Sequence, residues 1–327
     1  MNMIEVRGLS RTFQAPQGEV NAVRGVDFTV AAGEIVGFLG PNGAGKTTTM
    51  RMLTTLLRPT SGTAVIAGHD LLGDPVGVRR RIGYVAQGGG ANPAESVVNE
   101  LMLQARLYGL SKSEARSRIA VLAGRLGLDG LEGRLVSSLS GGQRRRLDIA
   151  LGLVHQPPLI FLDEPSTGLD PTSRNNLWDH IRKLRDELGA TVFLSTHYLD
   201  EADALCDRIL IMDRGTILVE DSPEELKGRV SGDVVTVEVA PEGVAAATAV
   251  VERLPSARSV IPGGNTIRFR TEHSSRTMVD IMHALESSAV DIVSIQVDRP
   301  SLDDVFLALT GQPTEELHSA AAAPAGA

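Results

Sequence analysis

A glycine-rich segment that contains a lysine and a threonine is the strongest chemical signal in the sequence. Residues 40–47 read Gly-Pro-Asn-Gly-Ala-Gly-Lys-Thr, which fulfils the phosphate-loop pattern G-x-x-x-x-G-K-[ST]. Glycines let the backbone turn tightly, so that successive N–H groups converge on phosphate oxygens at the start of a helix. Lys46 is expected to reach the β- and γ-phosphates of ATP, and the Thr47 hydroxyl to bind Mg²⁺. The predicted nucleotide-binding residues here are Gly40, Pro41, Asn42, Gly43, Ala44, Gly45, Lys46, Thr47 and Thr48.

Two consecutive carboxylates follow a fully apolar run. Residues 159–162 read Leu-Ile-Phe-Leu, and Asp163 and Glu164 come next. Ligands bind in α/β sheets at the carboxyl ends of the strands, so Asp163 is expected to hold the hydration shell of Mg²⁺ beside the phosphate loop. Glu164 is the candidate to orient or deprotonate an attacking water. A solvated acidic turn would explain the carboxylates, but it would not explain the apolar strand before them.

A second glycine turn offers another set of hydrogen-bond donors. Residues 139–143 read Leu-Ser-Gly-Gly-Gln and precede an amphipathic run that extends from Arg144 to Val154. The start of a helix has free N–H groups that attract anions, although most turns of this composition only cap a helix. The position of this turn, after the phosphate loop and shortly before the acidic pair, favours nucleotide binding by Ser140, Gly141, Gly142 and Gln143.

The elements around these motifs predict an α/β fold in residues 1–230. Short apolar runs alternate with helical stretches, which is typical of a mostly parallel sheet. Residues 97–109 and 111–127 read as two helices with no strand between them, so a helical subdomain is expected at about residues 93–155. The predicted buried strands are Ile35–Leu39, Ile82–Val85, Leu159–Leu162 and Thr191–Leu194, followed by an antiparallel pair, Arg208–Met212 and Thr216–Glu220.

A different pattern begins near residue 230. Residues 231–310 read in the order βαββαβ, which predicts a small ferredoxin-like α+β domain. A final helix is expected to begin after Ser301 and to carry an apolar stripe. This stripe consists of Leu302, Val305, Phe306 and Leu309, and it either closes the core of the small domain or contacts a second copy. Residues 311–327, rich in Ala and Pro, are expected to form a disordered tail.

Composition excludes several classes of protein. The 327 residues include 32 Lys+Arg and 40 Asp+Glu, which gives a net charge of −8, with 42% apolar residues. This acidic balance and the low aromatic content argue against nucleic acid as a partner. The single cysteine, Cys206, excludes an intrachain disulfide and is expected to be a buried apolar residue. No run approaches the roughly 20 apolar residues that cross a bilayer, and no secretory signal is recognised at the N-terminus.

Taken together, the motifs GPNGAGKT, LSGGQ and LIFLDEP make residues 1–230 resemble the ATP-binding subunit of an ABC transporter. The resemblance implies further roles. Gln87 would sense Mg²⁺ and the attacking water, and it would link the site to a membrane partner. Asp170 would belong to a loop at the nucleotide, although it also suits a helix N-cap before Pro171. His197 would contact the γ-phosphate, and Phe13 would stack on adenine unless it is an ordinary core residue.

The same resemblance implies an assembly. Two copies would pair head to tail, so that each ATP lies between residues 40–47 of one copy and residues 140–143 of the other. The segments GGQRRRLDIA, STHYLDEADALCDRI and RPSLDDVFLALTG are similar to drug-exporter ATPases of the daunorubicin-resistance type. Such a protein would work at the cytoplasmic face of the membrane with a separate integral membrane permease. Residues 88–101, GGGANPAESVVNEL, are looser and richer in glycine than this family leads one to expect.

Two other functions are weighed against export. A soluble ABC-type ATPase could remodel a protein or nucleic-acid complex, but such proteins usually contain two nucleotide modules or long charged insertions. A nucleotide-binding regulator with little turnover is disfavoured because Glu164 and His197 are both present. Export is the direction of transport that the family resemblance implies.

Overall fold

The computed structural model describes residues 1–16, 18–229, 233–271, 274–288, 290–298 and 300–310. Contacts divide the chain into two compact units, of which the first comprises Met1–Pro223 and the second begins at Glu224. Among the described residues, no helix has both the length and the apolar composition needed to cross a membrane. The tail predicted at residues 311–327 lies outside the described residues.

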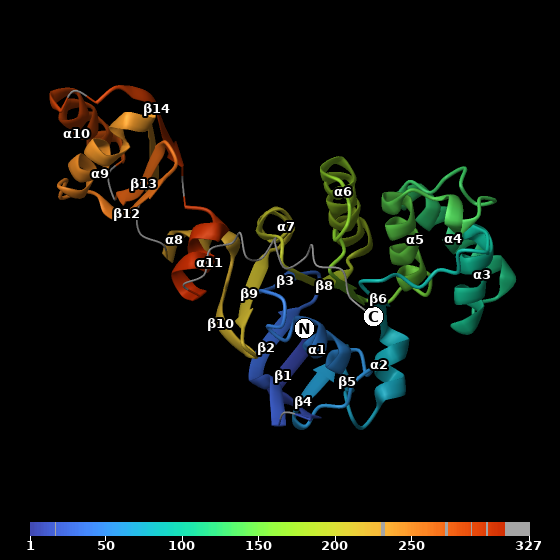
Figure 1. The fold of residues 1–327 in the computed structure, drawn as a ribbon. Helices are drawn as coiled ribbons and strands as arrows, with labels where there is room; N and C mark the ends of the chain where they lie inside the picture. Colours follow the sequence, from blue (N-terminus) through green and yellow to red (C-terminus); the bar gives the residue numbers. More distant parts are fainter. Residues whose placement is uncertain (17, 230–232, 272–273, 289, 299, 311–327) are drawn as a thin grey trace. The chain divides into compact units, whose positions relative to one another are not determined.

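A six-stranded sheet forms the centre of the first unit (Figure 1). Its order is β10-β9-β3-β8-β7-β6, and only the pairing of β10 with β9 is antiparallel. All residues of β3, β7 and β8 are buried, which explains why these strands are continuous apolar runs. The predicted α/β fold is therefore confirmed. The strands are β3 (Ile35–Leu39), β6 (Ile82–Val85), β7 (Leu159–Asp163), β8 (Thr191–Thr196), β9 (Arg208–Asp213) and β10 (Thr216–Asp221).

The first unit also contains an antiparallel sheet that the sequence analysis did not predict. Its order is β2-β1-β4-β5, and its strands are β1 (Asn2–Ala15), β2 (Gly18–Ala31), β4 (Ser61–Ile66) and β5 (His69–Asp70). Register shifts interrupt the pairing of β1 with β2 at several points, so the two-residue alternation that identifies a strand is broken. Helix α1 (Lys46–Leu53) packs with both sheets through a shared core that includes Ile4, Leu9, Val36, Phe38 and Met50.

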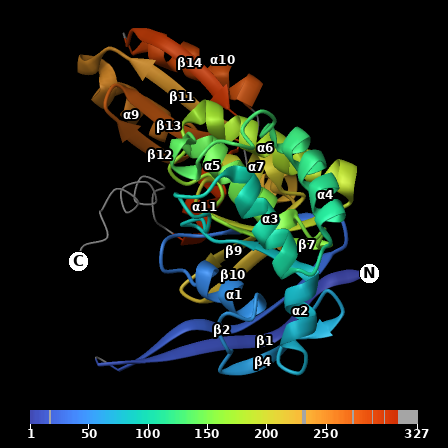
Figure 2. The same ribbon diagram turned by 90° about the vertical axis from the view of Figure 1, so that its right-hand side faces the viewer.

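The predicted helical insertion lies between β6 and β7. It consists of α3 (Val97–Leu107), α4 (Lys112–Leu126), a short 3₁₀ turn (Val136–Ser138) and α5 (Gly141–Leu153). Ser96 and Ser111 cap the first two helices by accepting hydrogen bonds from backbone N–H groups. Figure 2 shows these helices and α6 (Pro171–Leu188) grouped away from β1, β2 and β4. The remaining helices of this unit are α2 (Pro75–Arg81) and α7 (Leu199–Leu205), and α8 (Pro223–Arg229) follows at the division between the units.

The second unit contains a four-stranded antiparallel sheet of order β12-β13-β11-β14. Numbered along this unit, the order is 2-3-1-4, which is that of the predicted ferredoxin-like fold. Helices α9 and α10 contribute Ala247, Val251, Ile281 and Leu285 to its core. The elements are β11 (Asp233–Val239), α9 (Val244–Glu252), β12 (Arg258–Gly263), β13 (Thr266–Thr271), α10 (Ser274–Ser287), β14 (Ile292–Asp298) and α11 (Leu302–Thr310), with a 3₁₀ turn at Pro241–Gly243.

Helix α11 carries the stripe predicted at the end of the chain. Leu302, Val305 and Phe306 are buried, but Leu309 is 43% exposed. The buried face of the helix is therefore narrower than its apolar pattern, and contact of this stripe with a second copy stays a prediction.

Candidate nucleotide-binding site

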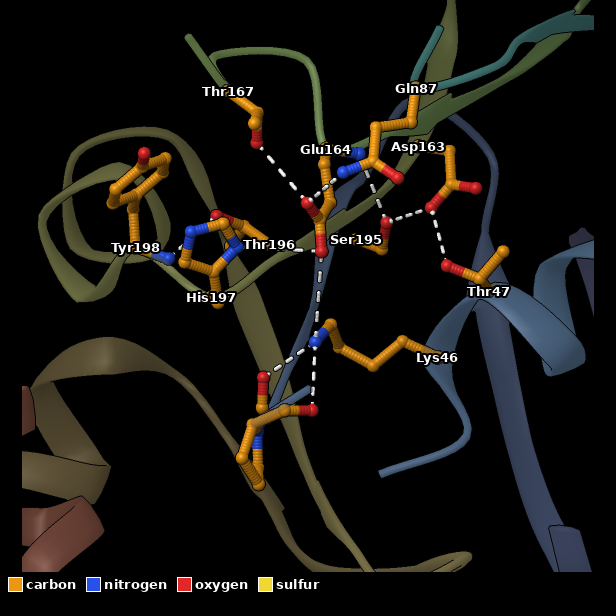
Figure 3. A network of polar contacts seen from close by, with 12 residues as sticks. Lys46, Thr47, Gln87, Asp163, Glu164, Thr167, Ser195, Thr196, His197 and Tyr198 are labelled. Carbon is orange, nitrogen blue, oxygen red and sulfur yellow. Dashed lines mark hydrogen bonds and ion pairs between the residues drawn. The ribbon is translucent and has the colours of Figure 1, made fainter. Parts of the chain in front are cut away.

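The parallel strands bring the predicted chemistry to one edge of the central sheet. Residues 40–47 follow β3, Gln87 follows β6, Asp163 ends β7, and His197 follows β8. Because β3, β6, β7 and β8 run in the same direction, their carboxyl ends lie together. Figure 3 shows Lys46, Thr47, Gln87, Asp163, Glu164 and His197 around one centre.

Close packing explains two glycines of the phosphate loop. A Cβ atom at Gly40 would lie 2.2 Å from the carbonyl oxygen of Met212, and one at Gly45 would lie 2.4 Å from that of Ala22. Gly43 and Gly45 also have φ angles of 83° and 107°, which side chains disfavour. Gly45 immediately precedes α1, so this conformation directs the loop into the start of the helix.

Lys46 is held inside the loop. Its side chain is 4% exposed, and Nζ donates to the carbonyl oxygens of Gly40 and Pro41 at 2.6 and 3.1 Å. The same atom lies 3.9 Å from Oε1 of Glu164. Burial lowers the pKa of Lys46, whereas the charges of Glu164 and Asp163 oppose that shift. The ammonium group is thus directed to the space that the loop encloses.

Asp163 lies at the end of β7 with only 2% of its surface exposed. Thr47 Oγ1 donates to its Oδ1 at 3.2 Å, and Ser195 Oγ donates to the same oxygen at 2.6 Å. A hydroxyl and a carboxylate side by side are the hard oxygen donors that Mg²⁺ prefers. Within the described residues, no cluster of three or more His, Cys, Asp or Glu side chains could hold a metal. The donor types of Thr47 and Asp163 fit a Mg²⁺ ion.

Glu164 has the densest set of contacts in the site. Gln87 Nε2 donates to its Oε2 at 2.8 Å, and Thr167 Oγ1 donates to the same oxygen at 3.2 Å. His197 Nδ1 lies 3.4 Å from Oε1. Burial by itself would raise the pKa of Glu164, but His197, Lys46 and Thr167 outweigh it and hold that pKa below its ordinary value. Glu164 is consequently a fixed carboxylate at neutral pH.

The backbone at Glu164 is strained. Its φ angle is 46°, in the left-handed region that residues other than glycine rarely adopt. The Glu164 N–H group lies 3.1 Å from both the carbonyl oxygen and Oγ of Ser195, and these two acceptors fix its direction. Strain of this kind costs on the order of 1–3 kcal/mol and is retained where the surroundings hold it. Here it turns the two neighbouring carboxylates to different parts of the site.

His197 completes the group with buried nitrogen atoms. The residue is 2% exposed, and neither ring nitrogen makes a hydrogen bond within the described part of the chain. At 3.4 Å, its approach to Glu164 is an electrostatic contact whose geometry is not that of a hydrogen bond. A buried polar atom without a partner costs free energy, so the ring is suited to contact a bound phosphate oxygen.

Two residues that the sequence analysis did not select hold the site together. Ser195 links Asp163 to the backbone of Glu164, as described above. Arg145 is 7% exposed and donates to the carbonyl oxygens of Ala86, Asp163 and Pro165 at 2.7–2.9 Å. Within the run Arg144–Arg146, Arg145 is buried, whereas Arg144 is exposed and Arg146 is half-buried. An arginine run gives no sign of which member turns inward, because only the packing of α5 decides it.

The other predicted residues lie outside this group. Ser140 and Gln143 form a reciprocal capping box at the start of α5. Asp170 caps α6 by accepting a hydrogen bond from Ser173 N at 2.9 Å. Phe13 is half-buried on β1, with the Arg11 guanidinium 4.5 Å from its ring centroid. Among the described residues, no hydrogen bond or ion pair joins these positions to the group around Glu164.

Two parts of the chain match models of known protein families. Residues 23–167 match the family model described as ABC transporter, and residues 222–310 match that of the ATP-binding protein DrrA1-3-like, C-terminal domain. A doxorubicin resistance ATP-binding protein DrrA from Mycobacterium tuberculosis is 42% identical over 320 residues, which cover 96% of this chain and 95% of the relative. The daunorubicin/doxorubicin resistance ATP-binding protein DrrA of Streptomyces peucetius is also 42% identical, over 96% and 94% of the two chains.

A solved structure supports the assignment of the fold. The ATP-binding cassette MJ0796, in a dimeric post-hydrolysis state bound to ADP and Pi, matches with a TM-score of 0.62 and 26% identity. The match covers 67% of this chain and 98% of that one. The chain thus belongs to the ABC transporter family and is one of its ATP-binding, ATP-hydrolysing subunits. Within this family it is of the daunorubicin-resistance type, with the corresponding C-terminal domain.

Proposed function

We propose that this ATPase powers export of a hydrophobic or amphipathic drug through a separately encoded integral membrane subunit. The observation that carries the proposal is the convergence of Lys46, Thr47, Asp163 and Glu164 at one sheet edge, in a chain similar over nearly its full length to drug-resistance ATP-binding proteins. The drug named for each relative is a property of that relative.

We infer that the residues of the site divide the hydrolysis of ATP among them. The N–H groups of residues 40–47 and the Lys46 ammonium bind the phosphates. To do so, Lys46 Nζ exchanges its hydrogen bonds to the Gly40 and Pro41 carbonyl oxygens for hydrogen bonds to phosphate oxygens. Thr47 and Asp163 hold Mg²⁺, which when bound neutralises charge on the phosphates. Glu164, oriented by Gln87 and Thr167, accepts a proton from the attacking water. His197 donates a hydrogen bond toward the γ-phosphate.

The proposed adenine contact at Phe13 is constrained by Arg11. The guanidinium group already lies over one face of the ring, so adenine stacks on the opposite face unless Arg11 moves. The guanidinium group favours an aromatic face through a cation–π contact, and adenine favours one through stacking.

ABC ATPases act as dimers, and we propose that this chain forms one with a head-to-tail arrangement. Ser140 and Gly141 are exposed at the start of α5, where free N–H groups attract an anion. Asn42 and Gly43 are exposed in the phosphate loop. One triphosphate satisfies both sets of donors when they come from different copies. ATP would then hold the dimer together, and hydrolysis would loosen it.

A membrane subunit is the partner expected of an ABC transporter ATPase of this type. We propose that the chain associates with it at the cytoplasmic face and that Gln87 and the following residues lie next to the contact. This segment is held to α5, since Gly90 N donates to Asp148 Oδ1 at 3.1 Å. A movement of Gln87 would thereby be transmitted to the helical insertion.

The test is expression of this chain with and without the gene of a candidate membrane subunit, followed by ATPase assays and a panel of hydrophobic drugs. Resistance should require both genes and should disappear in Lys46→Ala, while Lys112→Ala, outside the site, should retain it. If resistance is the same without the membrane gene, or if DNA stimulates the ATPase of the isolated chain, the remodelling function is favoured instead.

A further inference from the structure

A cleft in the second unit has an unusual concentration of arginine. Its volume is about 510 Å³, and its described lining residues include Arg229, Arg258, Arg268 and Arg270 but only one carboxylate, Asp304. The three arginines of β12 and β13 and this one carboxylate leave an excess of two positive charges, whereas the whole chain is acidic. None of these residues belongs to the nucleotide site.

The strands of this unit place three of the arginines together. Arg268 and Arg270 are two residues apart on β13, so they occupy the same face of the sheet. Arg258 of β12 is the cross-strand partner of Arg270. The opposite face of β13 supplies Ile267 and Phe269 to the hydrophobic core. Like charges directly opposite one another destabilise a sheet, so the pairing of Arg258 with Arg270 calls for a counter-charge.

Asp304 of α11 offsets only part of the positive charge of these arginines. Its Oδ1 accepts from Arg268 Nη2 at 3.3 Å and lies 3.1 Å from Arg270 Nη2. Its Oδ2 accepts from the backbone N and Oγ of Ser301 at 2.9 and 2.8 Å. Arg270 Nη1, in contrast, is buried and has no hydrogen-bond partner within the described residues. One nitrogen of this guanidinium is therefore held by Asp304, while the hydrogen-bonding capacity of the other is not used by the described residues.

We propose that this cleft binds a small organic anion through a phosphate group. A guanidinium group presents paired N–H donors that match phosphate oxygens. A phosphate monoester carries nearly two negative charges at neutral pH, so it offsets more of the excess than a single carboxylate would. Ile261, Leu307 and Ala308 add apolar surface to the lining, and they favour a ligand with an alkyl part. The phosphate belongs either to a soluble metabolite or to the headgroup of an anionic phospholipid.

The experiment uses the full chain as the Glu164→Gln variant, saturated with Mg-ATP so that the phosphate loop is occupied. Hexyl phosphate is titrated by calorimetry, and vesicles of phosphatidylcholine with or without phosphatidylglycerol are tested by flotation. Arg258→Gln and Arg270→Gln should each weaken binding of the responsive probe by about tenfold, because each removes charge-assisted hydrogen bonds. Arg253→Gln makes the same charge change at an exposed position outside the cleft and should have no effect.

The two arms identify the source of the phosphate. Binding of hexyl phosphate without vesicles supports a soluble ligand, and binding that requires phosphatidylglycerol supports a headgroup. The proposal is overturned if neither probe binds, or if Arg253→Gln weakens binding as much as the two cleft variants do. Arg258 is exposed, so Arg258→Gln tests the proposal even if Arg270→Gln does not fold.

Discussion

At the scale of single residues, the site depends on carboxylates that neighbouring groups hold in defined directions. Glu164 is fixed by Gln87, Thr167 and His197 on its side chain and by Ser195 on its backbone. Asp163, the preceding residue, faces Thr47 instead. The left-handed conformation of Glu164 separates the two directions, so adjacent residues have different chemical roles.

Replacing Glu164 with Gln should separate binding from hydrolysis. The amide preserves the shape of the side chain but cannot accept a proton, and general-base catalysis contributes about 10²–10⁴ to a rate. ATP binding should be retained while turnover falls by about that factor, as measured by phosphate release and by equilibrium binding of ATP. Glu187→Gln, at an exposed position of α6, is the control. Near-normal turnover in Glu164→Gln would remove Glu164 from this role.

At the scale of elements, His155 joins the helical insertion to the central sheet. It follows α5, its Nε2 donates to the Ile82 carbonyl oxygen at 3.0 Å, and its ring stacks on Tyr108 with centroids 3.6 Å apart. Burial lowers its pKa to about 4, with a smaller contribution from Arg118. Its Nδ1 is buried without a hydrogen-bond partner among the described residues. Protonation therefore adds a charge that this junction does not compensate.

The pKa of His155 predicts a loss of stability in acid. The unfolded chain takes up this proton near pH 6.5 and the folded chain only near pH 4, so the folded state binds fewer protons between these values. The contribution of neutral His155 to the free energy of unfolding is complete above about pH 6.5 and is lost as the pH falls toward 4. His155→Gln should reduce the pH-dependent decline in unfolding free energy by up to about 3 kcal/mol.

The single tryptophan provides the measurement for this prediction. Trp178 is buried in the first unit, so its fluorescence during urea unfolding reports on that unit alone. His283→Gln, at an exposed position of α10, is the control and should preserve the wild-type decline. An identical pH dependence in wild type and His155→Gln would show that His155 does not titrate as inferred.

At the scale of the whole molecule, the two units have separate hydrophobic cores. The core of the nucleotide-binding unit extends from Met3 to Met212, and that of the second unit lies between Val235 and Val290. The residues around Glu164 all come from the first unit. The group of residues around Glu164 thus includes no residue after 232. We expect the second unit to act in dimer contact or regulation.

Deleting the chain from residue 232 onward should preserve ATP binding and lower transport. The site retains all its contacts in the shortened chain, whereas the regulatory contacts are lost. Binding is measured with a fluorescent ATP analogue, and transport by drug efflux from cells that also express the membrane subunit. The full-length Leu309→Ala variant, altered only at an exposed position of α11, tests whether that side chain forms a contact. Unaltered efflux by the shortened chain would defeat the regulatory role.

Local patterns in the sequence determined the phosphate loop, the two adjacent carboxylates at the end of β7, the strands of the six-stranded sheet, the helical insertion and the element order of the second unit. They did so because glycine spacing, continuous apolar runs and helical periodicity act over a few residues. Tertiary structure alone decided that Ser195 binds Asp163, that Arg145 turns inward and that Arg258 meets Arg270 across two strands. Such contacts depend on strand pairing and helix packing between residues far apart in the chain. The antiparallel sheet of the first unit was also decided by tertiary structure, because register shifts in β1 interrupt the two-residue alternation from which a strand is predicted.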